Sequence, residues 1–302
     1  MRLTKQAATI DKGTMNSPKW LDRILYPFAH RTLDLPAGNM HYVDEGQGEP
    51  IVLVHGTPTW SFVWRQQIKA LSRNYRCIAP DHLGFGLSAK PAGFAYTPEA
   101  HADNLEQLID HLQLKNITLV VHDFGGPIGL RYALRHPENV KKIVILNTWM
   151  WSLEEEKKIM KISRFMAGGV GRFLYLQLGF SANFLLPQGY HEGKHLTKDI
   201  KLHYQKPLST SGSRMGTWGF AKALHESSSY FDELWQQHEK LRTIDKLLLW
   251  GEKDKLLPVH FLERWQQEFP EAKTIKYKAG HFVQEERGGE VADAIHHFIL
   301  NK

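Results

Sequence analysis

The chain has 302 residues, of which 42% are hydrophobic and 23% are charged, and this composition is typical of a folded globular protein rather than a disordered or fibrous one. A chain of this length holds either two average domains or one α/β core with an insertion. The formal net charge is +6, but Lys and Arg are spread along the chain and mixed with acidic residues. We therefore expect neither a nucleic-acid partner nor a membrane partner.

The single cysteine, Cys77, excludes an intrachain disulfide bond and fits a reducing compartment. The first twenty residues contain charges but no apolar run of signal-peptide length, and no later segment is apolar over the length that spans a membrane. We expect a cytoplasmic protein.

Short apolar or β-branched runs alternate with longer helical stretches in the first half of the chain. The alternation predicts a mostly parallel sheet with helices on both faces. The predicted strands are Met40–Asp44, Ile51–Val54, Tyr75–Ile78, Ile117–Val121 and Lys142–Leu146.

The pattern changes after Leu146. The segment from 148 to 235 is rich in Trp, Phe, Tyr, Leu and Gly, shows helical spacing in pieces and has no strand–helix alternation. We interpret it as an inserted helical cap.

Two further strands are predicted beyond this segment, at Lys246–Trp250 and Lys273–Tyr277, and an amphipathic helix follows at Gly288–Leu300. The predicted core domain is therefore discontinuous in sequence and consists of residues 1–147 and 236–302.

The strongest local signal for chemistry lies around Asp123, where the strand-like Val120-Val121-His122 runs directly into Asp-Phe-Gly-Gly-Pro and then a helix, Ile128–Arg135. This is the pattern of a nucleophile elbow, in which the nucleophile sits in a strained turn and glycines allow the next helix to approach. A carboxylate needs no deprotonation at neutral pH and attacks carbon directly to form an ester of the enzyme. Asp123 is therefore the candidate nucleophile.

Two backbone N–H groups are candidates for an oxyanion hole. His55-Gly56-Thr57-Pro58 follows a predicted strand, and its turn residues direct the N–H of Thr57 into the site. Together with the N–H of Phe124 it would bind the charge that develops during hydrolysis of the enzyme ester.

A histidine and a carboxylate complete the predicted catalytic set. Asp254 follows the buried strand pattern Leu247-Leu248-Leu249-Trp250, and His281 stands in a loop after the last strand, so the chain order is nucleophile, acid, histidine. A carboxylate on one ring nitrogen fixes the tautomer while the other nitrogen takes a proton from water. We prefer Asp254 to Glu252 because it stands further beyond the strand end.

With these motifs in place, the chain resembles the haloalkane dehalogenases of the α/β-hydrolase superfamily. The resemblance spans roughly residues 30–150 and 240–300, through HGTPTWSFVWR, APDHLGFGLSAKP, VVHDFGGPIGL, WGEKDKLLP and GHFVQEE. It implies an α/β-hydrolase fold with a mostly parallel eight-stranded sheet, and a reaction in which Asp123 displaces a halide before water activated by His281 hydrolyses the ester. No cofactor and no metal would be needed, and the substrate would be a small apolar organic molecule. The other acid position of the family, near Asn147 and Thr148, holds no carboxylate in this chain.

The chain departs from the family's pattern at the residue after the nucleophile. In the dehalogenases this residue is typically a tryptophan whose indole N–H holds the leaving halide, whereas Phe124 has no side-chain donor. The usual second donor is an asparagine, where this chain has Thr57, or a cap tryptophan. The candidates to replace the missing donor are Trp149, Trp151 and Trp218.

Two alternatives remain open for the electrophile. Epoxide hydrolases also use an Asp nucleophile on this fold and donate to the epoxide oxygen from two cap tyrosines, for which the chain offers Tyr175, Tyr190, Tyr204 and Tyr230. A small lactone or ester is the other alternative. A protein that has lost catalysis and serves as a binding module would form no covalent intermediate.

Overall fold

The structure is a computed structural model that describes residues 17–301. The expectation that the chain has no signal peptide concerns its first twenty residues, and residues 1–16 of these lie outside the described part. Across the part of the chain that is described, no helix is long and apolar enough to cross a membrane.

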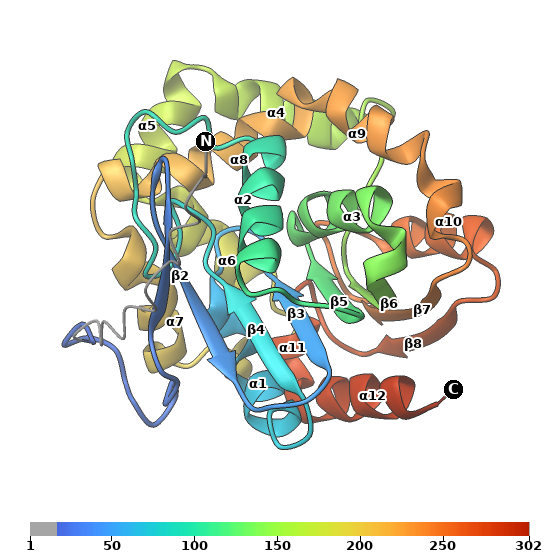
Figure 1. Cartoon of the computed structure of the whole chain (residues 1–302). Helices are drawn as coiled ribbons and strands as arrows, with labels where there is room; N and C mark the ends of the chain where they lie inside the picture. The colour runs from blue at the N-terminus through green and yellow to red at the C-terminus, as the bar shows by residue number, and fades with distance from the viewer. Residues whose placement is uncertain (1–16, 302) are drawn as a thin grey trace, which may run out of the picture.

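An eight-stranded sheet lies at the centre of the molecule (Figure 1). Its strands are ordered β1-β2-β4-β3-β5-β6-β7-β8; β2 is antiparallel to both of its neighbours, and all pairs from β4 to β8 are parallel. This confirms the predicted mostly parallel sheet. The strands are β1 Arg31–Leu35, β2 Gly38–Glu45, β3 Pro50–Val54, β4 Arg76–Pro80, β5 Ile117–His122, β6 Val140–Leu146, β7 Asp245–Gly251 and β8 Lys273–Tyr277.

The predicted strands agree with the observed ones to within two residues at each end, and the larger differences are one missed strand and one helix that begins earlier. No strand was predicted at β1, whose sequence RTLDL is mostly solvent-exposed and lacks an apolar run because β1 is an edge strand. The helix after Asp123 begins at Gly125 instead of Ile128. Pro127 is tolerated there because the N–H groups of a first helical turn have no intrahelical partner.

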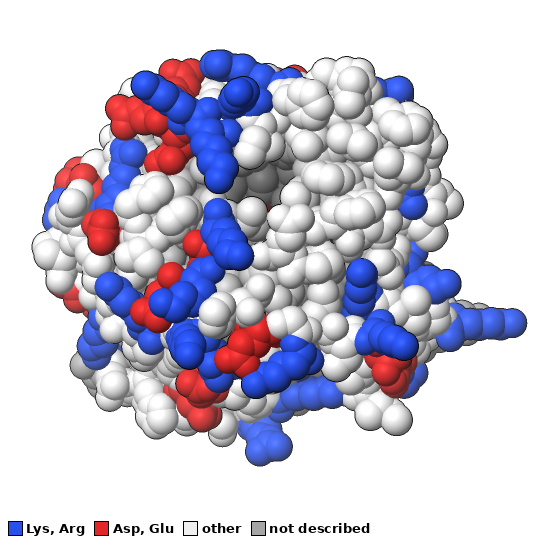
Figure 2. Space-filling model, turned by 180° about the vertical axis from the view of Figure 1, so that it is seen from behind, with Lys and Arg blue, Asp and Glu red and all other residues white. Residues whose placement is uncertain are grey.

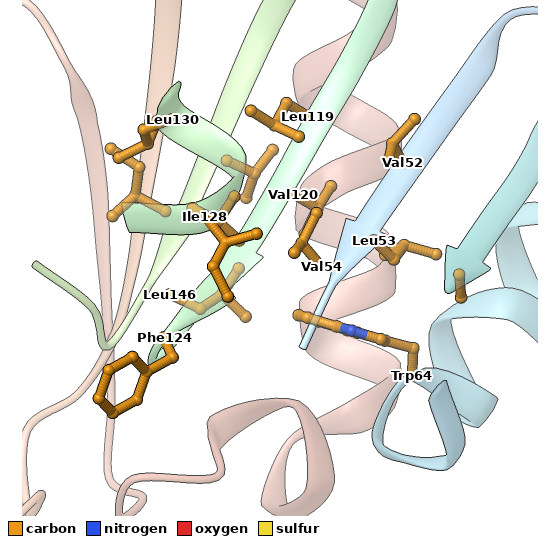
Figure 3. Close-up of a cluster of buried hydrophobic side chains, with 14 of the residues drawn as sticks. Val52, Leu53, Val54, Trp64, Leu119, Val120, Phe124, Ile128, Leu130 and Leu146 are labelled. Carbon is orange, nitrogen blue, oxygen red and sulfur yellow. The ribbon is translucent and has the colours of Figure 1, made fainter. Parts of the chain in front are cut away.

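The strand β5 is buried along its whole length, between β3 and β6. Up to its last residue its sequence ITLVVH consists of apolar or β-branched residues, as expected for a central parallel strand covered on both faces. Figure 3 shows Leu119 and Val120 on β5 beside Val52 on β3, with Ile128 of the following helix over them. This packing fixes the end of β5, where Asp123 stands.

The helices of the core lie beside the sheet, with α1 packed against α12 and α2 against α3 (Figure 1). The helix α2 begins in the usual way for its sequence, because the Thr97 hydroxyl accepts from the N–H of Ala100 and Pro98 occupies the first turn. The helices are α1 Arg65–Leu71, α2 Pro98–His111, α3 Gly125–Arg135, α10 Val259–Glu268, α11 Val283–Glu286 and α12 Gly288–Leu300.

All regular structure between β6 and β7 is helical. Figure 1 shows α4, α5, α8 and α9 together at one end of the sheet. The division into a core domain and a cap domain of residues 148–235 stays a prediction, but these helices occupy the predicted segment. They are α4 Lys157–Ala167, α5 Gly169–Leu178, α6 Leu186–Gln188, α7 Lys198–Gln205, α8 Met215–Glu226 and α9 Ser228–Trp235.

A buried ion pair ties this helical segment to the core. Arg65 at the start of α1 forms two parallel hydrogen bonds with the Glu285 carboxylate of α11, one of them 2.8 Å long. Tyr204 of α7 donates its hydroxyl to the same carboxylate. Both charged side chains are nearly inaccessible to solvent, so each depends on the other to remain ionised.

We predict that Arg65→Ala destabilises the protein by about 3–5 kcal/mol, because it leaves the buried charge of Glu285 without its partner. Urea denaturation measures the loss. The matched control is Arg242→Ala, which removes the exposed pair with Glu239 and should leave the midpoint nearly unchanged. Equal midpoints for the two variants would refute the structural role of the buried pair.

Candidate active site

Asp123 lies in a strained turn between β5 and α3. Its φ of 52° is in the left-handed region, which few non-glycine residues occupy. The turn is held on both sides, because the Asp123 N–H donates to the carbonyl of Asn147 (3.2 Å) and the Thr148 hydroxyl donates to the Asp123 carbonyl. A Cβ at Gly126 would lie 1.9 Å from that hydroxyl oxygen, so only glycine allows this close approach.

The carboxylate of Asp123 is surrounded by donors. The N–H of Thr57 donates to Oδ1 at 2.7 Å, and the backbone N–H of Phe124 lies near enough to lower the pKa of the carboxylate. Burial by itself raises the pKa of Asp123, but the hydrogen bond and charge of His281 and the Phe124 N–H outweigh burial and lower it overall. Asp123 is therefore ionised at neutral pH.

His281 lies between the two carboxylates. Its Nδ1 is 2.8 Å from Oδ2 of Asp254, and its Nε2 is 3.4 Å from Oδ2 of Asp123. Burial lowers the pKa of His281, but the charge and hydrogen bond of Asp254 and the nearby Asp123 carboxylate outweigh burial and raise the pKa to about 10. The structure thus brings together the three predicted catalytic residues. Glu252 instead points to the surface and pairs with Lys253.

Asn147 holds Asp254 in place, a role that sequence reasoning missed. Its side-chain amide donates to Oδ2 of Asp254 (2.9 Å), and its Oδ1 accepts from the N–H of Gly251 (2.8 Å). The other carboxylate oxygen of Asp254 accepts from the N–H groups of Leu256 and Leu257. Asn147 follows β6, where an acid could have stood, so the only sequence signal was its position.

Two further residues fix the loop that carries His281. The ring Nε2 of His122 lies 2.9 Å from the His281 carbonyl, and because a carbonyl only accepts, His122 carries its proton there. Burial and the nearby His281 lower the pKa of His122 to about 3, which keeps it neutral. Glu286 accepts from the N–H of Gly280, while the N–H of His281 donates to Gly189 in the helical segment.

A cavity of about 220 Å³ opens beside Asp123 between the core and the helical segment. Its walls are mainly apolar, which favours a small apolar ligand. No group of His, Cys, Asp and Glu within residues 17–301 is arranged to hold a metal ion. The core lining includes Thr57, Pro58, Asp123, Phe124, Leu256, Leu257 and Phe282, and the helical lining includes Leu153, Ile159, Ile162, Met166, Tyr175, Leu185, Leu186 and Leu224.

Of the three candidate tryptophans, only Trp149 lines this cavity. Its ring lies edge-to-face against Phe124, 4.9 Å between centroids, and its buried Nε1 has no hydrogen-bond partner among the described residues. Trp151 instead packs in an aromatic cluster with Trp235 and Trp265, and the indole of Trp218 donates to the Met166 carbonyl at 3.0 Å. The geometry thus brings only the Trp149 indole to the site.

Phe124 directs no polar group into the cavity. Its ring stacks on Phe220, with centroids 4.3 Å apart and planes 7° from parallel. Thr57, in contrast, lines the cavity, and its buried hydroxyl has no partner among residues 17–301. Trp149 Nε1 and Thr57 Oγ1 are therefore two buried donors of lining residues that have no partner among residues 17–301.

The four candidate tyrosines do not converge on Asp123. Tyr175 lines the cavity, whereas Tyr230 donates to the Pro127 carbonyl and Tyr204 to Glu285. Tyr190 does not line the cavity either. A pair of tyrosine donors facing the nucleophile, as epoxide opening would require, is therefore not assembled among these four residues.

Comparison with known proteins agrees with this geometry. The alpha/beta hydrolase fold family matches residues 49–288. A cis-3-alkyl-4-alkyloxetan-2-one decarboxylase of Shewanella oneidensis is 36% identical, over 92% of this chain and 90% of that protein. Haloalkane dehalogenase 2 of Mycobacterium tuberculosis is 35% identical, over 91% of this chain and 96% of that protein.

Solved structures of similar fold include haloalkane dehalogenases. The enzyme from Bradyrhizobium elkani superposes with a TM-score of 0.81 at 25% identity, over 89% of this chain and 96% of that one. The enzyme from Agrobacterium tumefaciens gives a TM-score of 0.78 at 28% identity, over 88% of this chain and 94% of that one.

We predict that Asp254→Asn lowers the pKa of His281 well below about 10, because it removes the largest raising influence. NMR titration of the imidazole, assigned by its absence in His281→Gln, measures the shift. The ion pair between His281 and Asp254 contributes its full free energy to stability below pH 6.5, and this contribution is lost as the pH rises towards 10. Asp110→Asn, at an exposed position, is the control and should leave the pKa of His281 unchanged. An unchanged pKa of His281 in Asp254→Asn would contradict the assignment of Asp254 as its partner.

Proposed function

Because the chain belongs to the haloalkane dehalogenase family of the α/β-hydrolase superfamily, we propose that it converts a haloalkane and water into an alcohol and a halide through an ester on Asp123. The observation that carries the proposal is that the ionised, buried carboxylate of Asp123 borders an apolar cavity and lies beside His281 and Asp254. It is an enzyme of the hydrolase class, and the proposal concerns its electrophile and its catalytic residues.

In the first step a carboxylate oxygen of Asp123 attacks the alkyl carbon, and the carbon–halogen bond breaks with its electron pair on the halide. The strained turn aims the carboxylate into the cavity, and the Thr57 N–H holds its Oδ1 in one orientation. Apolar walls leave the carboxylate with few competing solvent contacts. Proximity and orientation therefore supply much of the rate.

In the second step His281 acts as the base. Two carboxylates raise its pKa in the resting enzyme, and ester formation removes the charge of Asp123. The pKa of His281 then falls, and the ring releases its proton to solvent. The neutral imidazole takes a proton from the attacking water while Asp254 stabilises the imidazolium that forms. The N–H groups of Thr57 and Phe124 hold the charge that develops on the Asp123 oxygen before the alcohol leaves.

The leaving halide needs donors, because an anion released into an apolar pocket is costly. We assign this role to the indole Nε1 of Trp149, which lines the cavity and has no other partner among the described residues. The hydroxyl of Thr57 is the second donor on the same wall. Trp149 thereby replaces the indole that Phe124 does not provide.

We also propose that residues 148–235 act as the cap. The cavity takes part of its lining from core residues such as Phe124 and part from helical residues such as Ile159 and Leu185. The helical segment therefore sets the size of substrate that reaches Asp123.

A cytoplasmic location remains our proposal. Cys77 is a buried free thiol whose pKa is raised by burial to about 12, which fits a reducing compartment.

A second candidate reaction is the opening of an oxetan-2-one. Two observations favour it: Phe124 lacks the donor typical of dehalogenases, and a relative named as such a decarboxylase is 36% identical. Asp123 would attack the saturated ring carbon that is bonded to the ring oxygen. The bond between that carbon and the ring oxygen would break, which opens the ring and frees a carboxylate. The carboxylate would then leave as CO2, and the electrons of the broken carbon–carbon bond would form the double bond of an alkene. The bond between the alkyl carbon and the Asp123 oxygen would break at the same time, and its electrons would return to the Asp123 carboxylate.

The two reactions give different products from the same nucleophile. Incubation with bromoalkanes and with dialkyl oxetanones, with halide and alkene measured separately, distinguishes them. Alkene without halide would replace the first candidate by the second.

We predict that His281→Gln accumulates a covalent adduct with a haloalkane, because displacement needs only the carboxylate whereas hydrolysis needs the base. Intact-protein mass measurement shows the adduct, and peptide mapping places it on Asp123. The double variant Asp123→Asn/His281→Gln is the control and should remain unmodified. Unchanged turnover by His281→Gln would eliminate the scheme.

We predict that Trp149→Phe slows halide release by roughly tenfold or more, because a hydrogen bond to a charged group is worth about 1.5–3 kcal/mol. The matched controls are Trp151→Phe and Trp218→Phe, whose indoles lie away from the cavity and whose loss should leave halide release nearly unchanged. Initial rates of halide release on a bromoalkane decide the matter. A larger effect of either control than of Trp149→Phe would show that the donor is assigned wrongly.

A further inference from the structure

The outer surface of the helical segment is unusually apolar. Most of the large hydrophobic side chains that are exposed in the described part of the chain lie between residues 162 and 202. Phe165 and Phe173 are 54% and 56% exposed, on α4 and the neighbouring α5. Large exposed apolar patches mark interaction sites on soluble proteins.

The segment that forms much of this surface also carries positive charge. The sequence from Lys157 to His191 contains five Lys and Arg residues and no Asp or Glu. None of the five forms an ion pair with a carboxylate within residues 17–301. The nearest acidic run in sequence, Glu154–Glu156, precedes α4, and Glu156 lies 2.8 Å from His260. The positive residues are Lys157, Lys158, Lys161, Arg164 and Arg172.

Basic and apolar side chains share one stripe of α4. Lys158, Ile162 and Phe165 stand at positions i, i+4 and i+7, which fall on the same side of a helix, and all three are exposed. On α5, Val170 and Phe173 repeat the apolar part of the stripe. We call these residues, together with Lys161, the cap ridge.

The cap ridge borders the mouth of the cavity. Ile162 both lines the cavity and is 48% exposed, and Leu256 does the same from the core with 41% exposed. Figure 2 shows a face of the molecule with a hollow, Lys and Arg side chains along one side of it and a broad uncharged area on the other. An apolar path therefore leads from the outer surface to Asp123.

We propose that the cap ridge docks on an anionic lipid surface, with its aromatic and aliphatic side chains in the acyl boundary and its lysines at the headgroups. A helix with apolar residues on one stripe and Lys or Arg around them is the kind that lies in a membrane interface. Unpaired positive charge complements phosphatidylglycerol or another anionic headgroup. A docked enzyme receives an apolar substrate at the cavity mouth directly from the lipid.

This inference goes beyond the proposed reaction and does not depend on which electrophile is used. It also differs from the expectation, based on composition, that no membrane partner exists. Over the whole chain acidic residues balance most of the positive charge, whereas the fold gathers an acid-free segment onto one surface. Sequence averages conceal a local patch of this kind.

Co-sedimentation of the full-length protein with vesicles tests the proposal. We expect binding to vesicles of phosphatidylcholine with phosphatidylglycerol, weakening with added salt, and much weaker binding to phosphatidylcholine alone. Lys158→Gln/Lys161→Gln should lower the partition coefficient by about fivefold for each charge removed, and Phe165→Ser/Phe173→Ser by about tenfold or more.

Matched controls remove similar side chains elsewhere on the surface. They are Lys276→Gln/Lys278→Gln and Ile24→Ser/Leu300→Ser, all at exposed positions, and both should bind like the wild type. None of the substituted residues lines the cavity, so turnover of a short water-soluble substrate should be unchanged in every variant.

Absence of wild-type binding to anionic vesicles overturns the proposal, and so does equal loss in ridge and control variants. Light scattering tests the alternative that a second copy of the chain covers the cap ridge. If the wild type is a dimer that does not bind vesicles, and the ridge variants are monomers, the cap ridge is a contact between two copies of the chain.

Discussion

The carboxylate of Asp123 has to remain ionised inside an apolar cavity, and the rest of the site is arranged around that requirement. Burial alone would raise its pKa and neutralise it. The hydrogen bond and charge of His281, together with the Phe124 N–H, reverse this effect and lower the pKa. In the reaction that we propose, the same donors also serve the second step, since they surround the oxygen on which charge would develop. Asp254 and Asn147 act one layer further out by holding His281 in position.

Sequence patterns were most informative where one interaction dominates. Continuous apolar runs identified the central strands, because burial on both faces leaves no room for polar residues, and the positions of Asp123, Asp254 and His281 after strand ends placed them at one edge of the sheet. The edge strand β1 was missed because it is mostly exposed. Asn147 and His122 were not assigned positioning roles, since their partners are backbone or side-chain atoms distant in sequence. Local spacing also could not separate Trp149, which faces the cavity, from Trp151 and Trp218.

The leaving group is the constraint that distinguishes the candidate reactions. A halide must be solvated by donors of the protein, and the wall beside Asp123 offers Trp149 and Thr57 where Phe124 offers none. The carboxylate leaving group of an oxetanone stays attached to the carbon skeleton, so the reaction needs no halide site. Both substrates are apolar, and both suit a cavity whose mouth is continuous with the apolar cap ridge.

The most direct measurement of the account is a single turnover in water labelled with heavy oxygen, with excess enzyme and a bromoalkane. If Asp123 forms the ester, the first alcohol carries an oxygen from the unlabelled carboxylate, and the label appears in the peptide that contains Asp123. If water attacks the substrate directly, the label appears in the alcohol and Asp123 remains unlabelled. We expect the first result, and the second would show that Asp123 is not the nucleophile.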